Sequence, residues 1–353
     1  MSSHSREKYN QQAQWWRVYG RDRVICTLCP RYCNIPSGSH GFCYVRQNKV
    51  GTLYSSAYGK STGFAVDPIE KKPLYHFLPG SNILSFGTIG CNLGCKFCQN
   101  WHISKLGDER YMDKVYSPDE IIKMAKEKDC IGIAYTYNEP IIFSEWIIDI
   151  ASKARESGLK NVLVTNGYIT PEARKELFQY IDAANVDLKS ISKTFYKKLT
   201  LSDIEPVLNT LHWLVHESDV WIEITNLLIP DENDNPEDIE QLTKFITEEL
   251  SNNIPFHISA FHPDYKMLDK PTTPLKTLKK AYSIAKNNGL SYVYLGNIAD
   301  SDYTNTYCSQ CNQLIIERST YRINKLSLKN DKCIFCGYSI PGEFDSVKGK
   351  ATD

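Results

Sequence analysis

Apolar runs alternate with amphipathic stretches through the middle of the chain, from residue 80 to residue 300. Short apolar runs bounded by turn residues are typical of buried strands. The pattern predicts seven strands, at residues 83–87, 131–137, 162–166, 184–188, 220–228, 256–261 and 292–296. Because strand-like and helix-like segments alternate, we expect an α/β fold with a largely parallel sheet.

The segments between these strands carry helix-start signals. Ser117-Pro118-Asp119-Glu120 has the form of a capping box with proline at the first helical position, and Thr170-Pro171 repeats the device. Apolar residues at helical spacing mark residues 236–250 and 274–287 as the clearest amphipathic helices. The pattern therefore places helices between consecutive strands.

Roughly 220 residues of strand and helix units are too few for a complete eight-unit barrel, so an incomplete, open barrel over residues 81–300 is the simplest expectation. A doubly wound sheet is the alternative. Residues 1–80 and 301–353 contain most of the cysteines and little helical periodicity. We interpret both as small cysteine-rich modules at the two ends of the barrel.

The composition and charge limit the partners and the cellular location that we expect for the protein. The 353 residues contain 41 basic and 41 acidic side chains, so no field of one sign favours a nucleic acid or a membrane surface as partner. The first residues are polar, and no stretch reaches the ~20 apolar residues that would span a bilayer. We therefore expect a cytoplasmic protein.

Twelve cysteines in a chain of this kind indicate metal binding rather than disulfides, because the cytosol keeps thiols reduced. They form a group of four, a group of three and a second group of four, and Cys130 stands alone before an apolar run, where an inert buried thiol is expected. The groups are Cys26, Cys29, Cys33 and Cys43; Cys91, Cys95 and Cys98; and Cys308, Cys311, Cys333 and Cys336.

The group of three follows the first predicted strand and lies within eight residues. Structural zinc sites and ordinary iron–sulfur clusters use four protein ligands, so three thiols leave one metal position open for a substrate or cofactor. The alternatives are a zinc site completed by a distant residue such as His102, or three unrelated core cysteines.

The spacing C-x3-C-x2-C, with Phe97 before the last cysteine, resembles the radical S-adenosylmethionine (SAM) superfamily. The resemblance implies a [4Fe-4S] cluster on Cys91, Cys95 and Cys98, with the methionyl group of SAM on the fourth iron and Phe97 beside the adenine. It also implies that the reduced cluster cleaves SAM to a 5′-deoxyadenosyl radical, which abstracts hydrogen from a substrate.

Polar residues follow several of the predicted strands, where a barrel would gather them on one face. Asn138 and Glu139 match the superfamily element that contacts the methionyl ammonium of SAM. The alternative is that Asn138 caps a helix that begins near Pro140, with Glu139 favouring its positive end.

Four further residues resemble positions of the pyruvate formate-lyase activating enzymes. Thr165-Asn166 and Asp187 look like the elements that help hold a monovalent cation against the SAM carboxylate, a role suited to oxygen ligands. His262 corresponds to a histidine near the SAM ribose. The alternatives are an ion pair between Asp187 and Lys189, and a histidine that only lines the wall.

The two outer cysteine groups differ in regularity. Cys308, Cys311, Cys333 and Cys336 form two C-x2-C knuckles, which is zinc-ribbon spacing, although a rubredoxin-type iron uses the same ligands. The spacings of Cys26, Cys29, Cys33 and Cys43 fit zinc and a second iron–sulfur cluster equally well.

Longer stretches at residues 29–33, 67–77 and 135–140 resemble the radical enzymes of the AmmeMemoRadiSam system, relatives of the pyruvate formate-lyase activases. The resemblance implies an external electron donor and association with a Memo-type and an AMME-type domain protein. The carboxylates of residues 67–77 and His76 either face the substrate or pair as a structural clasp.

These observations favour an activase-like enzyme that abstracts hydrogen from another macromolecule, with glycyl-radical installation as the nearest precedent. Radical modification of a small metabolite or lipid precursor is the alternative. A zinc-bearing scaffold or nucleic-acid-binding module is a remote third, against which the balanced charge and the three-thiol group argue.

Overall fold

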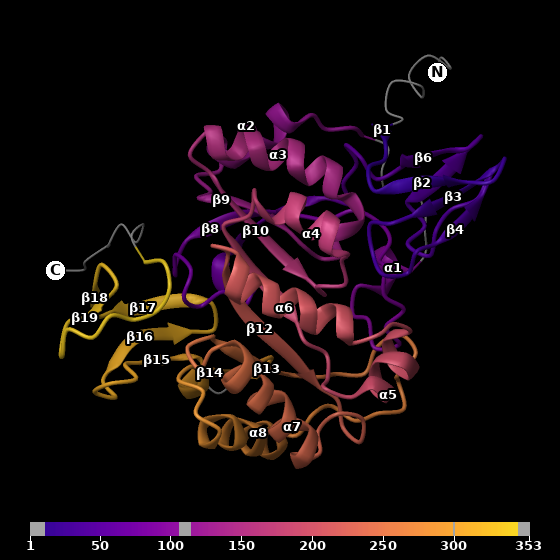
Figure 1. Ribbon diagram of the computed structural model, residues 1–353. Helices are drawn as coiled ribbons and strands as arrows, with labels where there is room; N and C mark the ends of the chain where they lie inside the picture. Colours follow the sequence, from indigo (N-terminus) through magenta and orange to yellow (C-terminus); the bar gives the residue numbers. More distant parts are fainter. Residues whose placement is uncertain (1–10, 106–113, 299–300, 345–353) are drawn as a thin grey trace.

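An eight-stranded sheet forms the centre of the protein in the computed structural model, which describes residues 11–105, 114–298 and 301–344 (Figure 1). Strands β8 to β14 are parallel, and β7 joins β8 antiparallel at one edge. The strands are β7 (Phe64–Pro68), β8 (Asn82–Phe86), β9 (Gly132–Tyr135), β10 (Lys160–Thr165), β11 (Ala183–Asp187), β12 (Trp221–Leu228), β13 (Phe256–Ala260) and β14 (Val293–Gly296).

Each strand of this sheet pairs with the next one along the chain, and β7 and β14 form the two edges. Sequential order without a reversal is the winding of a barrel, whereas a doubly wound sheet reverses its strand order at a switch point. The fold is therefore an open, partial α/β barrel, as predicted, and the doubly wound alternative is wrong.

All seven predicted strands are present within a few residues of their expected ends. The sequence pattern missed β7, which includes Asp67 and ends in Pro68. A proline cannot donate to a sheet and is confined to edges, so this short antiparallel strand has none of the apolar continuity of the buried strands.

Helices follow the strands and pack on the sheet; α3 lies on β10, and α8 lies on β13 and β14. The helices are α1 (Trp101–Ser104), α2 (Pro118–Glu127), α3 (Ser144–Glu156), α4 (Pro171–Phe178), α5 (Lys193–Phe195), α6 (Glu205–Glu217), α7 (Pro236–Lys244) and α8 (Leu275–Asn287). A π-helical turn over Phe245–Leu250 continues α7, so the predicted helix at 236–250 has two parts.

The helix-start predictions have different outcomes. The capping box of α2 is formed, because the Ser117 hydroxyl accepts from the Glu120 amide and the Glu120 carboxylate accepts from the Ser117 amide. Thr170 precedes α4 but does not cap it with its side chain. Its hydroxyl instead donates to the Thr27 carbonyl at 2.8 Å, which ties the helix start to the N-terminal module.

The N-terminal module consists of two three-stranded sheets. Its strands are β1 (Gln11–Gln12), β2 (Trp16–Tyr19), β3 (Arg23–Cys26), β4 (Asn34–Pro36), β5 (Arg46–Lys49) and β6 (Thr52–Ser55). A buried ion pair between Arg46 and Glu145 of α3, 2.5 Å long, joins this module to the barrel.

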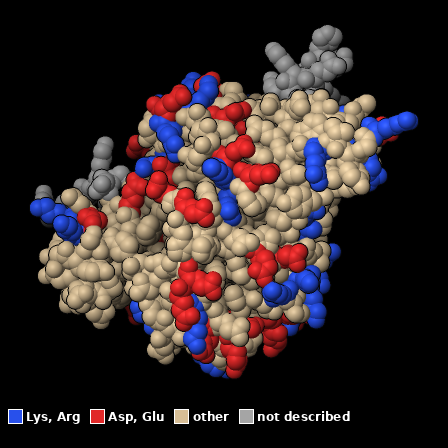
Figure 2. All heavy atoms as spheres, in the orientation of Figure 1, with Lys and Arg blue, Asp and Glu red and all other residues tan. Residues whose placement is uncertain are grey.

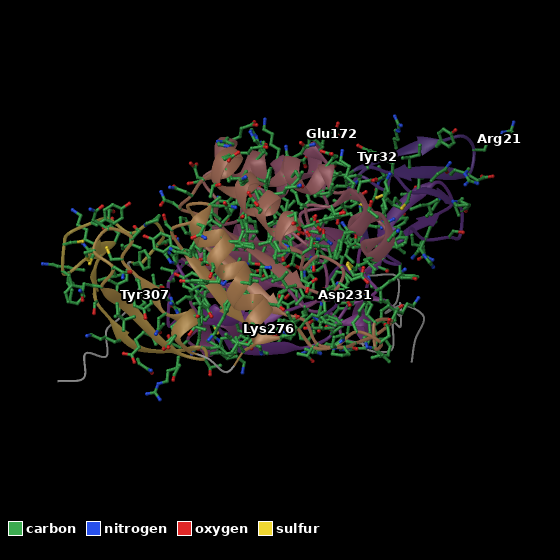
Figure 3. The ribbon with its side chains drawn as sticks, turned by 90° about the horizontal axis from the view of Figure 1, so that it is seen from below. Arg21, Tyr32, Glu172, Asp231, Lys276 and Tyr307 are labelled. Atoms are coloured by element: carbon green, nitrogen blue, oxygen red, sulfur yellow. The ribbon has the colours of Figure 1, made fainter. Side chains whose placement is uncertain are left out.

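The C-terminal module carries short antiparallel strands: β15 (Thr306–Tyr307), β16 (Leu314–Ser319), β17 (Arg322–Leu326), β18 (Leu328–Lys329) and β19 (Lys332–Cys333). Tyr75, Tyr292 and Tyr294 share a hydrophobic core with it. Buried Arg318 donates to the Tyr75 carbonyl at 2.8 Å. The two cysteine-rich modules lie at opposite ends of the molecule, marked in Figure 3 by Tyr32 and Tyr307.

Charges of both signs are interspersed on the face shown in Figure 2, in agreement with the balanced composition. Within residues 11–105, 114–298 and 301–344, no helix is long and apolar enough to cross a membrane.

Candidate active site

A cavity of about 690 Å³ opens at the carboxyl ends of the barrel strands. This is the face on which barrel folds carry their active sites, and the volume is that of a site for a sizeable ligand. Of the residues predicted for the cluster and the cofactor, those lining the cavity are Cys91, Cys95, Phe97, Cys98, Asn138, Glu139, Thr165, Asn166 and Asp187.

The three thiols lie on the loop between β8 and α1, and its backbone is fixed from several sides. The Gly94 amide donates to the Thr200 carbonyl at 2.7 Å, and the Leu93 amide donates to the Cys91 sulfur at 3.3 Å. Gly90 has a positive φ of 88°, and a Cβ atom there would lie 2.1 Å from the Cys43 carbonyl oxygen. Only glycine fits at this position, so the loop and the N-terminal module are packed directly together.

The donor set fits a cluster with one open iron. Burial raises the pKa of the Cys91 thiol to about 12, so without a bound cation this thiol stays neutral. Metal coordination removes that barrier by holding the thiolate. The three sulfurs do not all lie within 4.8 Å of one another, whereas thiolates on one tetrahedral zinc stand about 3.8 Å apart. Each thiol can then bind a separate iron of a larger cluster.

Asn138 braces the cluster loop. Its carbonyl oxygen accepts from the Thr88 amide, and its amide group donates to the Thr88 hydroxyl and the Gly90 carbonyl, all at 2.9 Å. This side chain therefore positions the segment that leads to Cys91 and does not cap the 3₁₀ turn over Pro140–Phe143.

Glu139 joins three elements at the cavity wall. Its Oε1 atom accepts from the Thr165 hydroxyl at 2.6 Å and from the Ile141 amide at 3.1 Å, and its Oε2 atom accepts from the Asn166 amide at 2.8 Å. Burial raises the pKa of this carboxyl to about 7, against the effect of these donors. A carboxylate has about four acceptor sites, so capacity for one cationic ligand is left.

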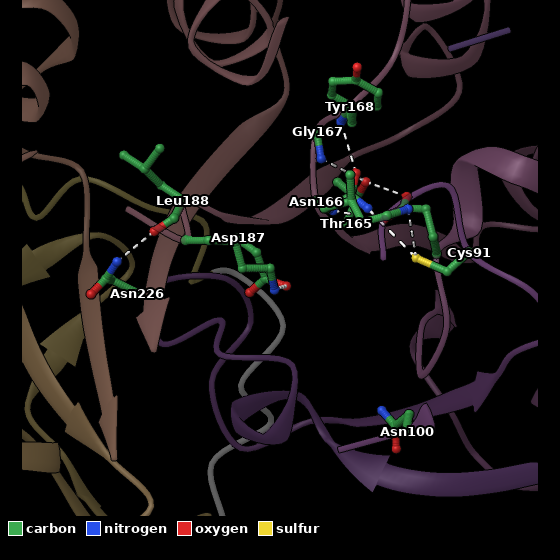
Figure 4. Close-up of polar contacts among 12 residues, drawn as sticks. Cys91, Asn100, Thr165, Asn166, Gly167, Tyr168, Asp187, Leu188 and Asn226 are labelled. Atoms are coloured by element: carbon green, nitrogen blue, oxygen red, sulfur yellow. Dashed lines mark hydrogen bonds and ion pairs between the residues drawn. The ribbon is translucent and has the colours of Figure 1, made fainter. Parts of the chain in front are cut away.

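Asn166 connects Glu139 to the thiols. Its side-chain amide donates to Asn92 Oδ1 at 2.9 Å and lies 4.0 Å from the Cys91 sulfur, the contact drawn in Figure 4. Thr165 and Asp187 end neighbouring strands of the same wall. The cluster loop and the polar strand ends therefore form one continuous surface.

Asp187 forms the ion pair with Lys189 that was the alternative to a cation site, with Oδ2 and Nζ 2.7 Å apart. Although burial lowers the pKa of Lys189, the nearby Asp187 carboxylate and Cys95 raise it well above its ordinary value. A positive charge is thus held beside the cluster loop.

The two candidate histidines are not in the cavity. His262 and His102 are both exposed, and neither lines it. His257, which lies on β13 five residues before His262, does line the cavity and bonds to Glu223 at 2.6 Å. Strand periodicity would have identified His257 as an inward-facing residue.

Lysines of this wall were missed by the sequence reasoning. Lys105 lines the cavity and donates to the Leu93 carbonyl; the neighbouring thiols raise its pKa even though burial opposes this. Lys72 is 2% exposed, and its Nζ lies 2.6 Å from Asp67. The signal for both is weak, because lysines are ordinarily solvent-exposed.

The segment 67–77 is chiefly a clasp. Asp67 accepts from Lys71, Lys72 and the Tyr137 hydroxyl. Buried His76 bonds through its two ring nitrogens to the Pro341 carbonyl and the Tyr294 hydroxyl. The segment thus fastens the barrel to the C-terminal module, while Glu70, Lys71, Lys72 and Tyr75 line the cavity.

The four C-terminal thiols form a compact group, within 4.8 Å of one another. Cys308 and Cys336 are 3.6 Å apart, and Cys311 and Cys333 are 3.8 Å apart. Four thiolates about 2.3 Å from a tetrahedral zinc stand about 3.8 Å apart, so the geometry fits a structural metal site. Cys130 is buried, as the sequence predicted.

Comparison with known proteins agrees with this geometry. Residues 86–246 match the model of the radical SAM superfamily. The chain is 42% identical over 332 residues to the uncharacterized protein MJ0808 of Methanocaldococcus jannaschii, covering 94% of this chain and 98% of that one. It is 30% identical over 180 residues to the pyruvate formate-lyase-activating enzyme of Listeria monocytogenes, covering 48% of this chain and 70% of the relative.

The chain therefore belongs to the radical SAM superfamily and is homologous to pyruvate formate-lyase activating enzymes. A radical SAM methyltransferase from Sphaerobacter thermophilus shares the fold, with a TM-score of 0.50, 12% identity and coverage of 89% of this chain and 86% of that one. The superfamily implies a [4Fe-4S] cluster and SAM, and the cavity's donor set fits both.

Proposed function

We propose that this protein is an activase-like radical SAM enzyme of the AmmeMemoRadiSam system that abstracts a hydrogen atom from its substrate. One observation carries the proposal: Cys91, Cys95 and Cys98, the only cysteines among the described residues that line this cavity, open into the same space as the Glu139 carboxylate. When bound there, the cluster and SAM supply a 5′-deoxyadenosyl radical that removes hydrogen from a nearby carbon.

The residues of the chain have separate tasks in this proposal. Cys91, Cys95 and Cys98 hold the cluster. Glu139 binds the SAM ammonium through its remaining acceptor capacity, and Phe97 forms the wall beside the adenine. Thr165, Asn166 and Asp187 complete the polar cradle, in which Lys189 takes the position that a monovalent cation would otherwise share.

The substrate would occupy the part of the cavity beyond this cradle. That part is lined by Lys72, His257 and Ser259, and by Thr320 and Tyr321 of the C-terminal module. An activase would admit a flexible segment of a partner macromolecule there. A Memo-type protein and an AMME-type domain protein are the proposed partners, together with a low-potential one-electron donor in the cytoplasm.

A second candidate is modification of a small metabolite or lipid precursor. The C-terminal module favours it, because Thr320 and Tyr321 of this module contribute to the cavity wall. Buried polar side chains such as Lys72 and His257 are the usual means of orienting a small polar ligand in such a cavity.

Isotope transfer separates the two candidates. Reduced enzyme and SAM are incubated with the protein fraction or the small-molecule fraction of cells grown in deuterated medium, and deuterium in 5′-deoxyadenosine is measured by mass spectrometry. Deuterium from the protein fraction supports the activase proposal. Deuterium from only the small-molecule fraction supports the second candidate and contradicts the first.

A further inference from the structure

The four N-terminal cysteines surround one small cavity. Cys26, Cys29, Cys33 and Cys43 all line it. Cys26 ends β3, Cys29 and Cys33 lie in the following turn, and Cys43 precedes β5. The Cys26 amide donates to the Cys33 carbonyl at 3.0 Å, so backbone hydrogen bonding closes the loop on which three of the thiols stand.

The spacing of these thiols distinguishes between the metals that could bind them. Across residues 11–105, 114–298 and 301–344, only the C-terminal four cysteines form a group of three or more metal-binding side chains within 4.8 Å of one another. Neither the N-terminal cysteines nor Cys91, Cys95 and Cys98 contain three sulfur atoms that all lie within 4.8 Å of one another. Thiolates around one zinc ion are close together, whereas thiolates on separate irons of a cluster stand farther apart.

An unpartnered polar atom lines the same cavity. Arg46 is 1% exposed, and its two terminal nitrogens bond to Glu145 and to the Gln14 carbonyl. Its Nε atom is buried and has no hydrogen-bond partner in the structure. A buried donor without an acceptor is costly, and the sulfur atoms of a cluster would supply the acceptor.

We propose that Cys26, Cys29, Cys33 and Cys43 hold a second iron–sulfur cluster, of the four-iron class. Four thiols give every iron a protein ligand, so this cluster has no open position for a substrate. Arg46 and Arg31, which line the cavity, oppose the negative charge of the thiolate-bound cluster. A single zinc ion is the alternative.

The position of the site suggests electron transfer. Asn92, next to Cys91, lines the N-terminal cavity, and Arg31 donates to the Asn92 carbonyl. Gly90 touches the Cys43 carbonyl region, so the two cysteine loops are in direct contact. Cys29 and Cys33 are partly exposed and accessible to an external donor.

The relay role rests on the proposed function. One electron from a low-potential donor would reduce the second cluster and then pass to the cluster held by Cys91, Cys95 and Cys98, with no change in bonds or protons. Because the two cysteine loops are in contact at Gly90 and Cys43, we expect the spins of the reduced clusters to interact.

Metal analysis of the anaerobically reconstituted full chain tests the proposal. We expect about eight iron, eight sulfide and one zinc per chain, with two four-iron components in the Mössbauer spectrum. Four iron and two zinc per chain would overturn it. This measurement needs no variant and is independent of folding changes caused by substitution.

Two variants then assign the clusters. Cys33→Ala should lose about half the iron, and the EPR spectrum of its remaining cluster should still change when SAM is added. Cys95→Ala should also lose about half the iron, but the EPR spectrum of its remaining cluster should not change when SAM is added. Spin coupling between reduced clusters should be present in the parent and in the matched control Cys130→Ala, and absent from both cluster variants. Unchanged iron in Cys33→Ala overturns the second cluster, whereas unchanged iron in Cys95→Ala overturns the proposed function and leaves the second cluster standing.

Discussion

The Oε1 atom of Glu139 lies 2.6 Å from the Oγ1 atom of Thr165, which joins the loop after β9 to the end of β10 at the cavity wall. Glu139→Gln should weaken SAM binding by about 1.5–3 kcal/mol, roughly ten- to hundredfold in Kd, because a charge-assisted hydrogen bond to the SAM ammonium is lost. Calorimetry on cluster-replete protein measures the change.

The cluster should survive in this variant, because Glu139 is not a ligand. Glu156→Gln, at the exposed end of α3, is the matched control. Equal affinity for SAM in Glu139→Gln and the parent would contradict a role in SAM binding. Glu139 would then serve only to position Ile141 and the ends of the neighbouring strands.

Lys105 should tune the cluster. Its ammonium lies among the thiols of the cluster loop, where positive charge stabilises the more negative, reduced state. Lys105→Gln should therefore lower the cluster's reduction potential, on the order of tens of millivolts. A redox titration followed by EPR measures this; Lys126→Gln on the exposed face of α2 is the control, and an equal or higher potential in Lys105→Gln contradicts the assignment.

His76 should make stability depend on pH. Burial lowers its pKa to about 4, against an ordinary value of 6.5. Because the folded-state pKa is depressed, the stabilisation is present above pH 6.5 and is lost as the pH falls toward 4. His76→Gln removes this pH-dependent contribution to the free energy of unfolding. The variant should be less stable than the parent at pH 7.5, and this difference in the free energy of unfolding should be about 1 kcal/mol smaller at pH 5.5.

Denaturant unfolding of the parent and of His76→Gln at the two pH values measures the difference in the free energy of unfolding. Both proteins keep Glu223 and Arg318, the charged residues whose fields act on His76, so the comparison reports on His76 itself. A deficit that stays constant or grows on acidification would mean that His76 is protonated in the folded protein.

The C-terminal metal should support its own module. Zinc removal should expose the amides of β15–β19 to hydrogen exchange while β8–β13 stay protected, because the four thiolates stabilise a segment with little core of its own. Mass spectrometry of the exchanged peptides reports both regions. Simultaneous loss of protection in β8–β13 would show that the metal stabilises the whole fold.

The sequence predicted most of the barrel because its strands are buried on both faces and read as apolar runs. Positions such as Glu139, Thr165 and Asp187 followed from the rule that strand ends meet at one face. Lys105 did not follow, because its placement depends on contacts between distant segments, whereas His257 could have been identified from the side-chain alternation of its strand.

The C-terminal four-cysteine group was recognisable as a metal site because all its cysteines lie in two short C-x2-C repeats. The N-terminal group was ambiguous for the opposite reason: only three-dimensional spacing distinguishes Cys26 and Cys43 around a cluster from the same residues around one ion.

The central claim is that Cys91, Cys95 and Cys98 hold a cluster on which SAM is cleaved. The most direct measurement is 5′-deoxyadenosine formed from SAM by anaerobic, dithionite-reduced protein, compared between the parent and Cys95→Ala. The account predicts turnover and a SAM-dependent EPR change in the parent, and neither in the variant, because two thiols cannot hold the open-iron cluster. Cleavage of SAM by Cys95→Ala at the parent's rate would contradict it.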